Sequence, residues 1–295
     1  MAFSRLSGDE QGVIFSLLCN TFDPGLAVAF SSASSELRAL TKEPRQQLRA
    51  GHEAAAAFCH KVGMRSCKAL REAKNVIWVG KNLSSADLAT LGNLDLVLPA
   101  LERLVLYESS PGPEGMERLF EKLGTGALPA LTSLNLDGLP LGDAGASALA
   151  AALDRGALPR LKMLDPTHAA IGDAGLAALA PALRRRPALE QLGLTGNTFG
   201  NEGLAALLAP WAPAGTSPPP AAGLKKLKHL DLSGTRINDA GCATLVAALD
   251  GGALPALAYG EFGWELFIDD IPASDAASDA VYEAIVRSRN LSPVE

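Results

Sequence analysis

Leu131-Thr132-Ser133-Leu134-Asn135-Leu136 is the stretch of this chain that decides its fold, because the same phrase returns along the sequence. The clearest other copies are Leu189-Glu190-Gln191-Leu192-Gly193-Leu194 and Leu227-Lys228-His229-Leu230-Asp231-Leu232, each followed by a short loop and an Ala/Leu-rich segment. Self-similarity at a fixed period indicates a solenoid, in which each repeat packs on its neighbours.

The repeat has a period of about 28–30 residues. Openings related to Leu-Pro-Ala-Leu place repeat starts at Leu98, Leu128, Leu158, Arg186, Leu224 and Leu254, in steps of 30, 30, 28, 38 and 30 residues. The long step contains an insertion at residues 212–223, where Pro and Gly cannot continue a helix, so we expect an exposed loop there.

Each repeat combines a strand pattern with a helix pattern. Alternating leucines such as Leu104 and Leu106 predict a short strand with both leucines facing inward. A Gly-Asp-Ala-Gly segment, as at 142–145 and 172–175, then precedes a helix-periodic Leu/Ala run, and we expect its Asp or Asn to cap its own helix. Because strand and helix alternate, successive strands must be parallel, which predicts an α/β horseshoe.

This pattern resembles the ribonuclease-inhibitor-like class of leucine-rich repeats, whose phrase is Leu-x-x-Leu-x-Leu-x-x-Asn/Cys with a Gly-Asp-x-Gly helix start. The resemblance covers about residues 98–265 and implies a parallel sheet inside, helices outside and a partner-binding inner face. Two departures stand out. Asn197 fills the Asn/Cys position, but the other copies have Ser109, Leu139, Ala169 and Thr235. Pro166 replaces an inward Leu, where it removes a donor from the sheet; we expect either a bulged strand or simple drift.

Both ends of the repeat region deviate from the leucine phrase. Residues 67–97 resemble a degenerate first repeat, with a strand at 76–79 and a capped helix at 84–91. Residues 261–265 interrupt the phrase, and the pattern from 274 to 289 predicts an amphipathic helix. Since a terminal repeat needs a polar outer face, we expect 266–295 to be a C-terminal capping helix.

Residues 1–66 contain no leucine phrase and predict two or three short helices, broken at 23–25. Their apolar spacing resembles an F-box, the helical module with which substrate receptors dock on the adaptor subunit of cullin-type ubiquitin ligases. The resemblance implies these adaptor-docking candidates: Leu6, Val13, Ile14, Phe15, Leu18 and Leu26. The family usually opens with Leu-Pro, whereas Ser7 follows Leu6 here. A plain helical cap on the hydrophobic end of the solenoid would give nearly the same pattern, so both interpretations stay open.

Side chains that alternate with the buried leucines are expected on the concave face. The partner-binding candidates are Arg103, Tyr107, Asn135, Asp137, Asp165, Gln191, His229, Asp231, Tyr259 and Glu261. Asp137, Asp165, Asp231 and Glu261 form an acidic stripe, which would steer basic partners. The two tyrosines are candidate anchors near opposite ends of the face. The alternative is that exposed strand positions are polar without having a specific role.

Composition and charge narrow the function classes. The chain is 48% hydrophobic and 20% charged, as expected for a folded protein. Its net charge of −6 argues against broad nucleic-acid binding, and residues 98–295, with 15 Lys/Arg and 23 Asp/Glu, are the acidic part. Neither a signal peptide nor an apolar run of about 18 residues is recognised, so we expect a cytoplasmic protein, with the nucleus as an alternative and no membrane partner.

Catalytic and metal-binding motifs are not recognised. The four cysteines show no paired spacing, and His52, Cys59, His60 and Cys67 match no usual zinc pattern, so we expect reduced thiols, no metal and no cofactor. Some leucine-rich proteins of this class activate small GTPases through an arginine near the first repeats, a region where Arg103 lies without a matching motif. We expect a non-catalytic, monomeric protein that holds a peptide or protein; the alternatives are a ligase substrate receptor, a plain scaffold or inhibitor, and a GTPase activator.

Overall fold

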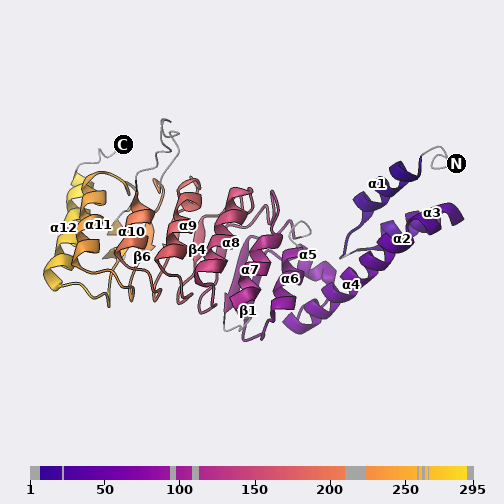
Figure 1. Ribbon diagram of the computed structural model, residues 1–295, viewed down its shortest axis with the longest axis horizontal. Helices are drawn as coiled ribbons and strands as arrows, with labels where there is room; N and C mark the ends of the chain where they lie inside the picture. The colour runs from indigo at the N-terminus through magenta and orange to yellow at the C-terminus, as the bar shows by residue number, and fades with distance from the viewer. Residues whose placement is uncertain are drawn as a thin grey trace.

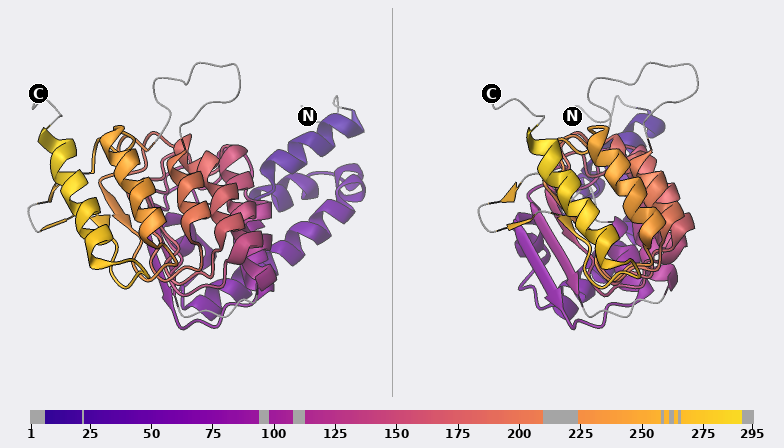
Figure 2. Two further views of the ribbon diagram at one scale, coloured as in Figure 1. Left: turned by 60° about the vertical axis from the view of Figure 1, so that its left-hand side comes forward. Right: turned by 90° about the vertical axis from the view of Figure 1, so that its left-hand side faces the viewer.

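The computed structural model describes residues 7–21, 23–93, 98–107, 113–209, 224–257, 259–260, 263–264 and 266–290. Within these ranges the repeats stack side by side along the long axis, and a helical N-terminal segment projects from one end of the stack (Figure 1). Viewed along the stack, the repeats form two layers, with strands on one side and helices on the other (Figure 2).

The strand layer is one parallel sheet of seven strands within the described ranges, in the order β1-β2-β3-β4-β5-β6-β9. Its strands are β1 (Asn75–Val79), β2 (Arg103–Tyr107), β3 (Ser133–Asn135), β4 (Met163–Asp165), β5 (Gln191–Gly193), β6 (His229–Asp231) and β9 (Leu266–Phe267). The second leucine of each phrase stays in register, since Leu104 pairs with Leu134 and Leu134 with Leu164.

The helices cover one face of this sheet and leave the other face open (Figure 2). They are α6 (Ser85–Asn93), α7 (Pro113–Lys122), α8 (Gly142–Asp154), α9 (Asp173–Arg184), α10 (Asn201–Leu208), α11 (Asp239–Asp250) and α12 (Asp275–Asn290). Strand and helix patterns of the repeats therefore form as expected, and the predicted α/β leucine-rich-repeat fold is confirmed.

The period-two alternation decides which side chains face the helices. Leu104 and Leu106 are buried under the helical layer, whereas Val105 and Tyr107 between and after them are half-buried on the open face. The same alternation recurs in every strand from β2 to β6, because successive side chains of a strand point to opposite faces. We call the open face of the sheet the concave face.

Carboxylates of one repeat cap the helix of the next. Asp143 Oδ1 accepts the backbone amides of Gly172 at 2.7 Å and Gly175 at 3.0 Å, at the start of α9. The contact recurs from Asp173 to Gly200 and Gly203, from Asn201 to Asn238, and from Asp239 to Ser274. The prediction that these side chains cap their own helices is thus wrong for α8, α9 and α10, which carry no side-chain cap of their own. It is confirmed for α11, where Asn238 Oδ1 accepts the amide of Ala240.

The opposite helix ends are joined by arginines. Arg155, after the last residue of α8, donates to the carbonyl oxygens of Phe120 and Leu123 at the end of α7. Arg186 donates to the Leu153 carbonyl of α8, and Arg184 donates to carbonyls in α10. Arg184 and Arg186 thus satisfy orphan carbonyls of neighbouring helices, while Arg185 between them pairs with the carboxylate of Asp154.

The irregular third repeat keeps its register. The β4–β5 ladder is short, pairing Met163 with Gln191 and Leu164 with Leu192, because Pro166 has no amide to donate. Beyond it, His168 N donates to Thr195 O at 2.8 Å in the same register, so the strand is not bulged. Asn197, which is 2% exposed, binds the carbonyl of Pro166 and accepts the amide of Ile171.

In the last repeat, the strand of the concave face is formed by other residues than the sequence predicted. We expected Tyr259 and Glu261 to continue it, but β7 (Tyr259–Gly260) pairs antiparallel with β8 (Gly263–Trp264) in a separate sheet. The strand next to β6 is β9, where Leu266 pairs with Leu230. The reason is that Gly260 stands where the second inward leucine is needed, and Leu266 with Ile268 supplies the buried pair. Glu261 and the insertion at 212–223 lie outside the described residues.

The N-terminal segment forms α1 (Gly8–Leu18), α2 (Gly25–Ser32), α3 (Ser35–Leu40) and α4 (Lys42–Val62), followed by α5 (Cys67–Glu72) before β1. The expectation of two or three short helices is wrong, because α4 is a continuous helix of 21 residues. Its sequence is rich in Ala, Gln, Glu, Lys and Arg, which favour helices, and its buried residues Leu48, Ala55, Phe58 and Val62 follow the helical spacing that could have identified it.

Two separate cores divide this segment. The C-terminal part of α4, through Ala55, Phe58 and Val62, packs with Val76 and Trp78 of β1 in the main core. Phe58 and Trp78 meet edge to face at 5.2 Å. The helices α1–α3 instead share a small core with the start of α4, formed by Phe15, Ala27, Phe30, Leu37 and Leu48. The open end of the solenoid is thus covered by α4 and α5, and α1–α3 form a module of their own.

Candidate functional site

A hollow of about 320 Å³ lies at the centre of the concave face. It is lined by Met163, Asp165, Thr167, Gln191, Gly193, His229 and Asp231, which come from β4, β5 and β6 and the residues that follow them. Asp165 and Asp231 end β4 and β6, and Gly193 at the end of β5 lies between them. We call this feature the acidic hollow.

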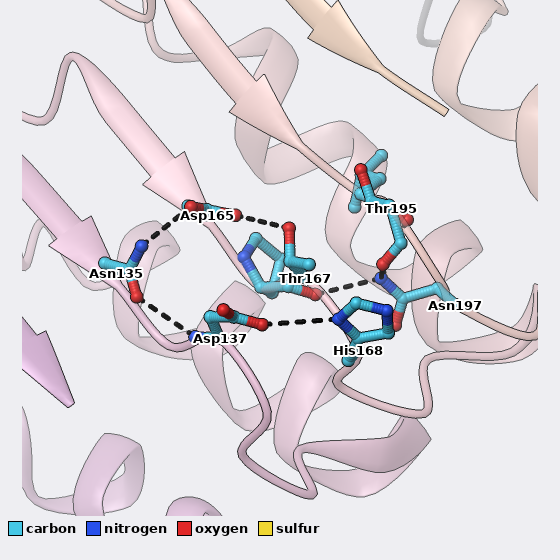
Figure 3. A network of polar contacts seen from close by, with 9 residues as sticks. Asn135, Asp137, Asp165, Thr167, His168, Thr195 and Asn197 are labelled. Atoms are coloured by element: carbon cyan, nitrogen blue, oxygen red, sulfur yellow. Dashed lines mark hydrogen bonds and ion pairs between the residues drawn. The ribbon is translucent and has the colours of Figure 1, made fainter. Parts of the chain in front are cut away.

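Asp165 is held by a network of polar contacts (Figure 3). Asn135 Nδ2 donates to its Oδ2 at 2.7 Å, and Thr167 Oγ1 donates to its Oδ1 at 2.6 Å. Asn135 Oδ1 in turn accepts the amide of Asp137, whose carboxylate lies 3.4 Å from His168 Nδ1. The donors, Asn135 and Thr167, are both uncharged, so they fix the position of the Asp165 carboxylate without neutralising its charge.

The electrostatics of the hollow disfavour negative charge on Asp165. Burial raises the pKa of this carboxyl above its ordinary value, the hydrogen bonds from Thr167 lower it, and the charges of Asp137 and Asp231 raise it further. A cation placed in the hollow would relieve both the desolvation and the repulsion between the carboxylates.

Gly193 is required for the shape of the hollow. A Cβ on this residue would lie 2.5 Å from Asp165 Oδ1 and 3.4 Å from Thr167 Oγ1. Any larger residue at this position would therefore displace the carboxylate. The glycine also keeps the floor of the hollow open between the two aspartates.

The C-terminal wall of the hollow is aromatic. His229 of β6 lies with its ring 5.3 Å from the ring of Phe267, in a tilted arrangement. Asp231 Oδ1 accepts the amide of Ser233 at 3.0 Å, which leaves its second oxygen to meet a ligand. This strand thus offers an acceptor and a flat ring side by side.

The N-terminal end of the concave face is apolar. Ile77 and Val79 of β1 are 58% and 46% exposed and pair with Val105 and Tyr107 of β2. The sequence indicated a strand at 76–79, but its outward-facing residues were not among the candidates. Alternation within that strand is the signal that could have identified them.

The predicted partner-binding residues that the structure describes lie in four places. Asp165, Gln191, His229 and Asp231 meet in the acidic hollow. Asn135 and Asp137 flank it, while Tyr107 and Arg103 lie on β2, with the Arg103 side chain exposed. Tyr259 belongs to the separate hairpin, outside the strand order of the concave face.

The predicted adaptor-docking residues do not share one exposed face. Val13 and Leu26 are 59% and 67% exposed, whereas Phe15 is in the small core and Ile14 and Leu18 pack against it. Leu6 lies outside the described residues. Leu17, which is 80% exposed on α1, was not among the candidates.

Cys59 and Cys67, two of the four residues weighed as a zinc site, are packed in the main core. Cys59 and Cys67 are buried free thiols with their Sγ atoms 3.8 Å apart, and burial together with Cys67 raises the pKa of Cys59 to about 12. Among the described residues, no group of three or more His, Cys, Asp and Glu is arranged to hold a metal ion. Within the same ranges, no helix has the length and apolar content needed to cross a bilayer.

Three segments of the chain, residues 128–150, 187–208 and 223–246, match the family model described as Leucine Rich repeat. The fold is of the leucine-rich-repeat type. The matched segments include β3 with α8, β5 with α10, and β6 with the start of α11. A search of curated protein sequences found no match.

Two of the solved structures that this chain resembles are internalins. Internalin C2 (inlC2) from Listeria monocytogenes is 20% identical, with 77% of this chain and 78% of that chain covered and a TM-score of 0.42. An internalin (inlF) from the same organism is 12% identical, with 78% and 85% covered and a TM-score of 0.22.

Proposed function

We propose that the concave face holds a basic, partly apolar segment of a partner protein. The observation that carries this proposal is the placement, on one open sheet, of the acidic hollow and the apolar surface formed by Ile77, Val79, Val105 and Tyr107. The candidates Arg103 of β2 and Asn135 of β3 would line the path between them, and Gln191 would contact the segment inside the hollow.

A basic partner follows from the charges of the hollow. Asp165 is kept partly buried beside Asp137 and Asp231, at a cost in free energy that a Lys or Arg side chain would offset. Charge-assisted hydrogen bonds from such a side chain are roughly twice as strong as neutral ones. Met163 and the His229 ring would contact its aliphatic part.

The length of the partner segment follows from the sheet. Parallel strands lie about 4.8 Å apart, so β1 and β4 are roughly 15 Å apart across the face. An extended chain spans about 3.3 Å per residue, so about five residues separate an apolar anchor at Ile77 from a basic one at Asp165. A peptide or loop is sufficient to occupy both places.

Selection of peptides from a random phage-displayed library on the full chain tests this proposal. We expect enriched peptides to carry Lys or Arg at a fixed distance from an aliphatic or aromatic residue. Counter-selection on the Asp165→Asn/Asp231→Asn variant should remove the basic position from the consensus. Enrichment of peptides without basic residues would contradict the proposal.

The N-terminal module favours a second candidate function, a substrate receptor of a cullin-type ubiquitin ligase. The supporting observation is that α1–α3 have their own core and expose Val13, Leu17 and Leu26 rather than covering the solenoid. In a plain scaffold or inhibitor, in which these helices only capped the repeats, such side chains would be buried against β1 or α5.

Affinity purification of the full chain tests the receptor function. A receptor is expected to recover the ligase adaptor and a cullin, and to lose both when Val13 and Leu17 are changed to Ser. If the unmodified chain recovers neither the adaptor nor a cullin, the receptor function is contradicted and the plain scaffold function is retained. The GTPase-activating alternative requires that Arg103→Ala lower the hydrolysis rate of a stimulated small GTPase.

A further inference from the structure

A second cavity of about 810 Å³ lies in the N-terminal module, away from the concave face. Its walls come from α2, α3 and α4, with Pro24 at the start of α2 and Leu48 of the small core among the lining residues. Such a volume is within the range of ligand-binding pockets, roughly 300–1,000 Å³. We call this feature the basic cleft, because of the side chains that surround it.

One face of α4 supplies a row of cationic side chains to the cleft. The cations Lys42, Arg45 and Arg49 follow at spacings of three and four residues, which places them along one stripe of the helix, and the His52 ring lies one turn further along the same stripe. Arg38 of α3 joins them, and no carboxylate is among the residues that line the cleft. The potential inside the cleft is therefore positive.

Ion pairs within the described residues leave most of this charge uncompensated. Arg49 pairs with Glu53 at 2.9 Å, with both side chains exposed. Arg38, Lys42 and Arg45 form no ion pair or side-chain hydrogen bond with any other described residue. Three guanidinium or ammonium groups thus face the cleft without an internal counter-charge.

The requirements of the fold do not explain this arrangement. Lys42 and Arg45 lie in the first turn of α4, where the helix dipole disfavours cations. Like charges three or four residues apart on a helix repel one another as well. A row that opposes helix stability in this way indicates a partner that carries negative charge.

The floor of the cleft identifies the class of partner. Pro24, Val28, Ala39 and Leu48 line it, and Val28 is 43% exposed. Among the described residues, no Phe, Tyr or Trp lines it for a nucleic-acid base to stack on, and the His52 ring is held at its edge with Nδ1 2.6 Å from the carbonyl oxygen of Thr21. A ligand that complements both the apolar floor and the cationic side chains around it carries carboxylates together with aliphatic side chains.

We propose that the basic cleft binds an acidic amphipathic peptide segment of a partner protein. Carboxylates of the segment pair with Arg38, Lys42 and Arg45, while its aliphatic side chains rest on Val28 and Leu48. This interaction is independent of the concave face, and therefore of the function proposed for the acidic hollow.

Fluorescence anisotropy with the full chain tests this inference. The probe is a fluorescein-labelled peptide of Glu-Leu-Glu-Glu repeats, and a second peptide replaces every Leu by Ser. We expect the Leu peptide to bind several-fold more tightly, and Arg38→Glu/Arg45→Glu to weaken it by at least about tenfold. The control Arg160→Glu/Arg236→Glu makes the same change in net charge at exposed positions on the repeats and is expected to leave binding unchanged.

Three results would overturn the inference: equal weakening by both double variants, no preference for the Leu peptide, or tighter binding of phosphatidylserine vesicles or single-stranded RNA than of the peptide. If the charge reversal unfolds the module, Arg38→Gln/Arg45→Gln provides the same comparison. Asp165→Asn/Asp231→Asn should leave this binding unchanged, which separates its failure from failure of the concave-face proposal.

Discussion

Asp143 Oδ1 lies 3.0 Å from the amide nitrogen of Gly175, so a carboxylate of one repeat caps the first turn of the next repeat's helix. The same side chain also accepts the amide of Gly172. Because Asp173 and Asp239 repeat this contact, the helical layer is joined at its N-terminal edge by a series of caps that cross between repeats. Stability of each repeat therefore depends on its predecessor through polar contacts as well as through the leucine core.

Replacing Asp143 by Ala should destabilise the protein by about 1–2 kcal/mol, because two orphan amides of α9 lose their acceptor. Asp143→Asn keeps one oxygen acceptor and should lose less. Urea unfolding followed by circular dichroism measures both changes. Equal stability of Asp143→Ala and the unmodified protein would show that water replaces the carboxylate at no cost.

Gly175→Ala should also destabilise the protein, although Ala is favoured over Gly in helices by about 1 kcal/mol. The added Cβ would lie 2.5 Å from Asp143 Oδ1 and 2.9 Å from Asp143 Cα, which forces the two repeats apart. Gly12→Ala is the matched control in α1, since nothing lies within 4 Å of its added Cβ, and it should be neutral or stabilising. A Gly175→Ala protein as stable as the control would refute the close approach.

The leucine alternation and the repeat period were sufficient to predict the fold. Leu104, Leu134 and Leu164 are buried where the period-two pattern placed them. The role of the Gly-Asp-Ala-Gly segment was misassigned, because a sequence pattern shows an acceptor near a helix start but not which helix it reaches. The amides of both glycines donate to the carboxylate of the preceding repeat, and the missing side chain of the second glycine gives that carboxylate room.

The concave face was harder to predict than the core. Tyr259 was placed on it by counting one more repeat, but the hairpin at 259–264 moves the last strand to Leu266. The buried pair of this repeat, Leu266 and Ile268, follows the extra residues. Counting a constant repeat length from the previous repeat therefore assigns the wrong residues to the strand. The long helix α4 was missed although the sequence carries its signal: Leu48, Ala55, Phe58 and Val62 follow a helical spacing, and the polar residues between them form its exposed face.

Stability should depend on pH through Asp165. Burial raises its pKa in the folded protein, whereas the unfolded chain has the ordinary value near 3.9. Between these two pKa values the folded protein holds a proton that the unfolded chain lacks, so the free energy of unfolding falls as pH rises. The decrease in the free energy of unfolding is complete at pH values above the raised pKa of the folded protein. It is absent at pH values below the ordinary pKa of the unfolded chain.

Asp165→Asn cannot ionise and should not show this loss. The free energy of unfolding of the unmodified protein, relative to that of Asp165→Asn, should therefore decrease as pH rises through this window. Urea unfolding of both proteins at a series of pH values measures the difference. A difference that is constant with pH, or that increases, would contradict the assigned pKa shift.

Gly193→Ala should impair the acidic hollow with little effect on the leucine core. Its Cβ would displace Asp165 Oδ1 from its position beside Thr167, and the space between the two aspartates would narrow. We expect the affinity for a selected basic peptide to fall by about tenfold, a loss of about 1.4 kcal/mol. Gly12→Ala again serves as the control, and unchanged affinity in Gly193→Ala would place the binding site elsewhere on the protein.

The most direct test of the concave-face account is the affinity of a selected basic peptide for two double variants, measured by isothermal titration calorimetry. Asp165→Asn/Asp231→Asn removes the charges of the hollow, and Glu121→Gln/Glu202→Gln removes the same number of exposed charges from helices α7 and α10. We predict a loss of at least about a hundredfold in affinity for the first variant and less than about twofold for the second. Equal affinities for the two variants would contradict the assignment of the acidic hollow as the binding site.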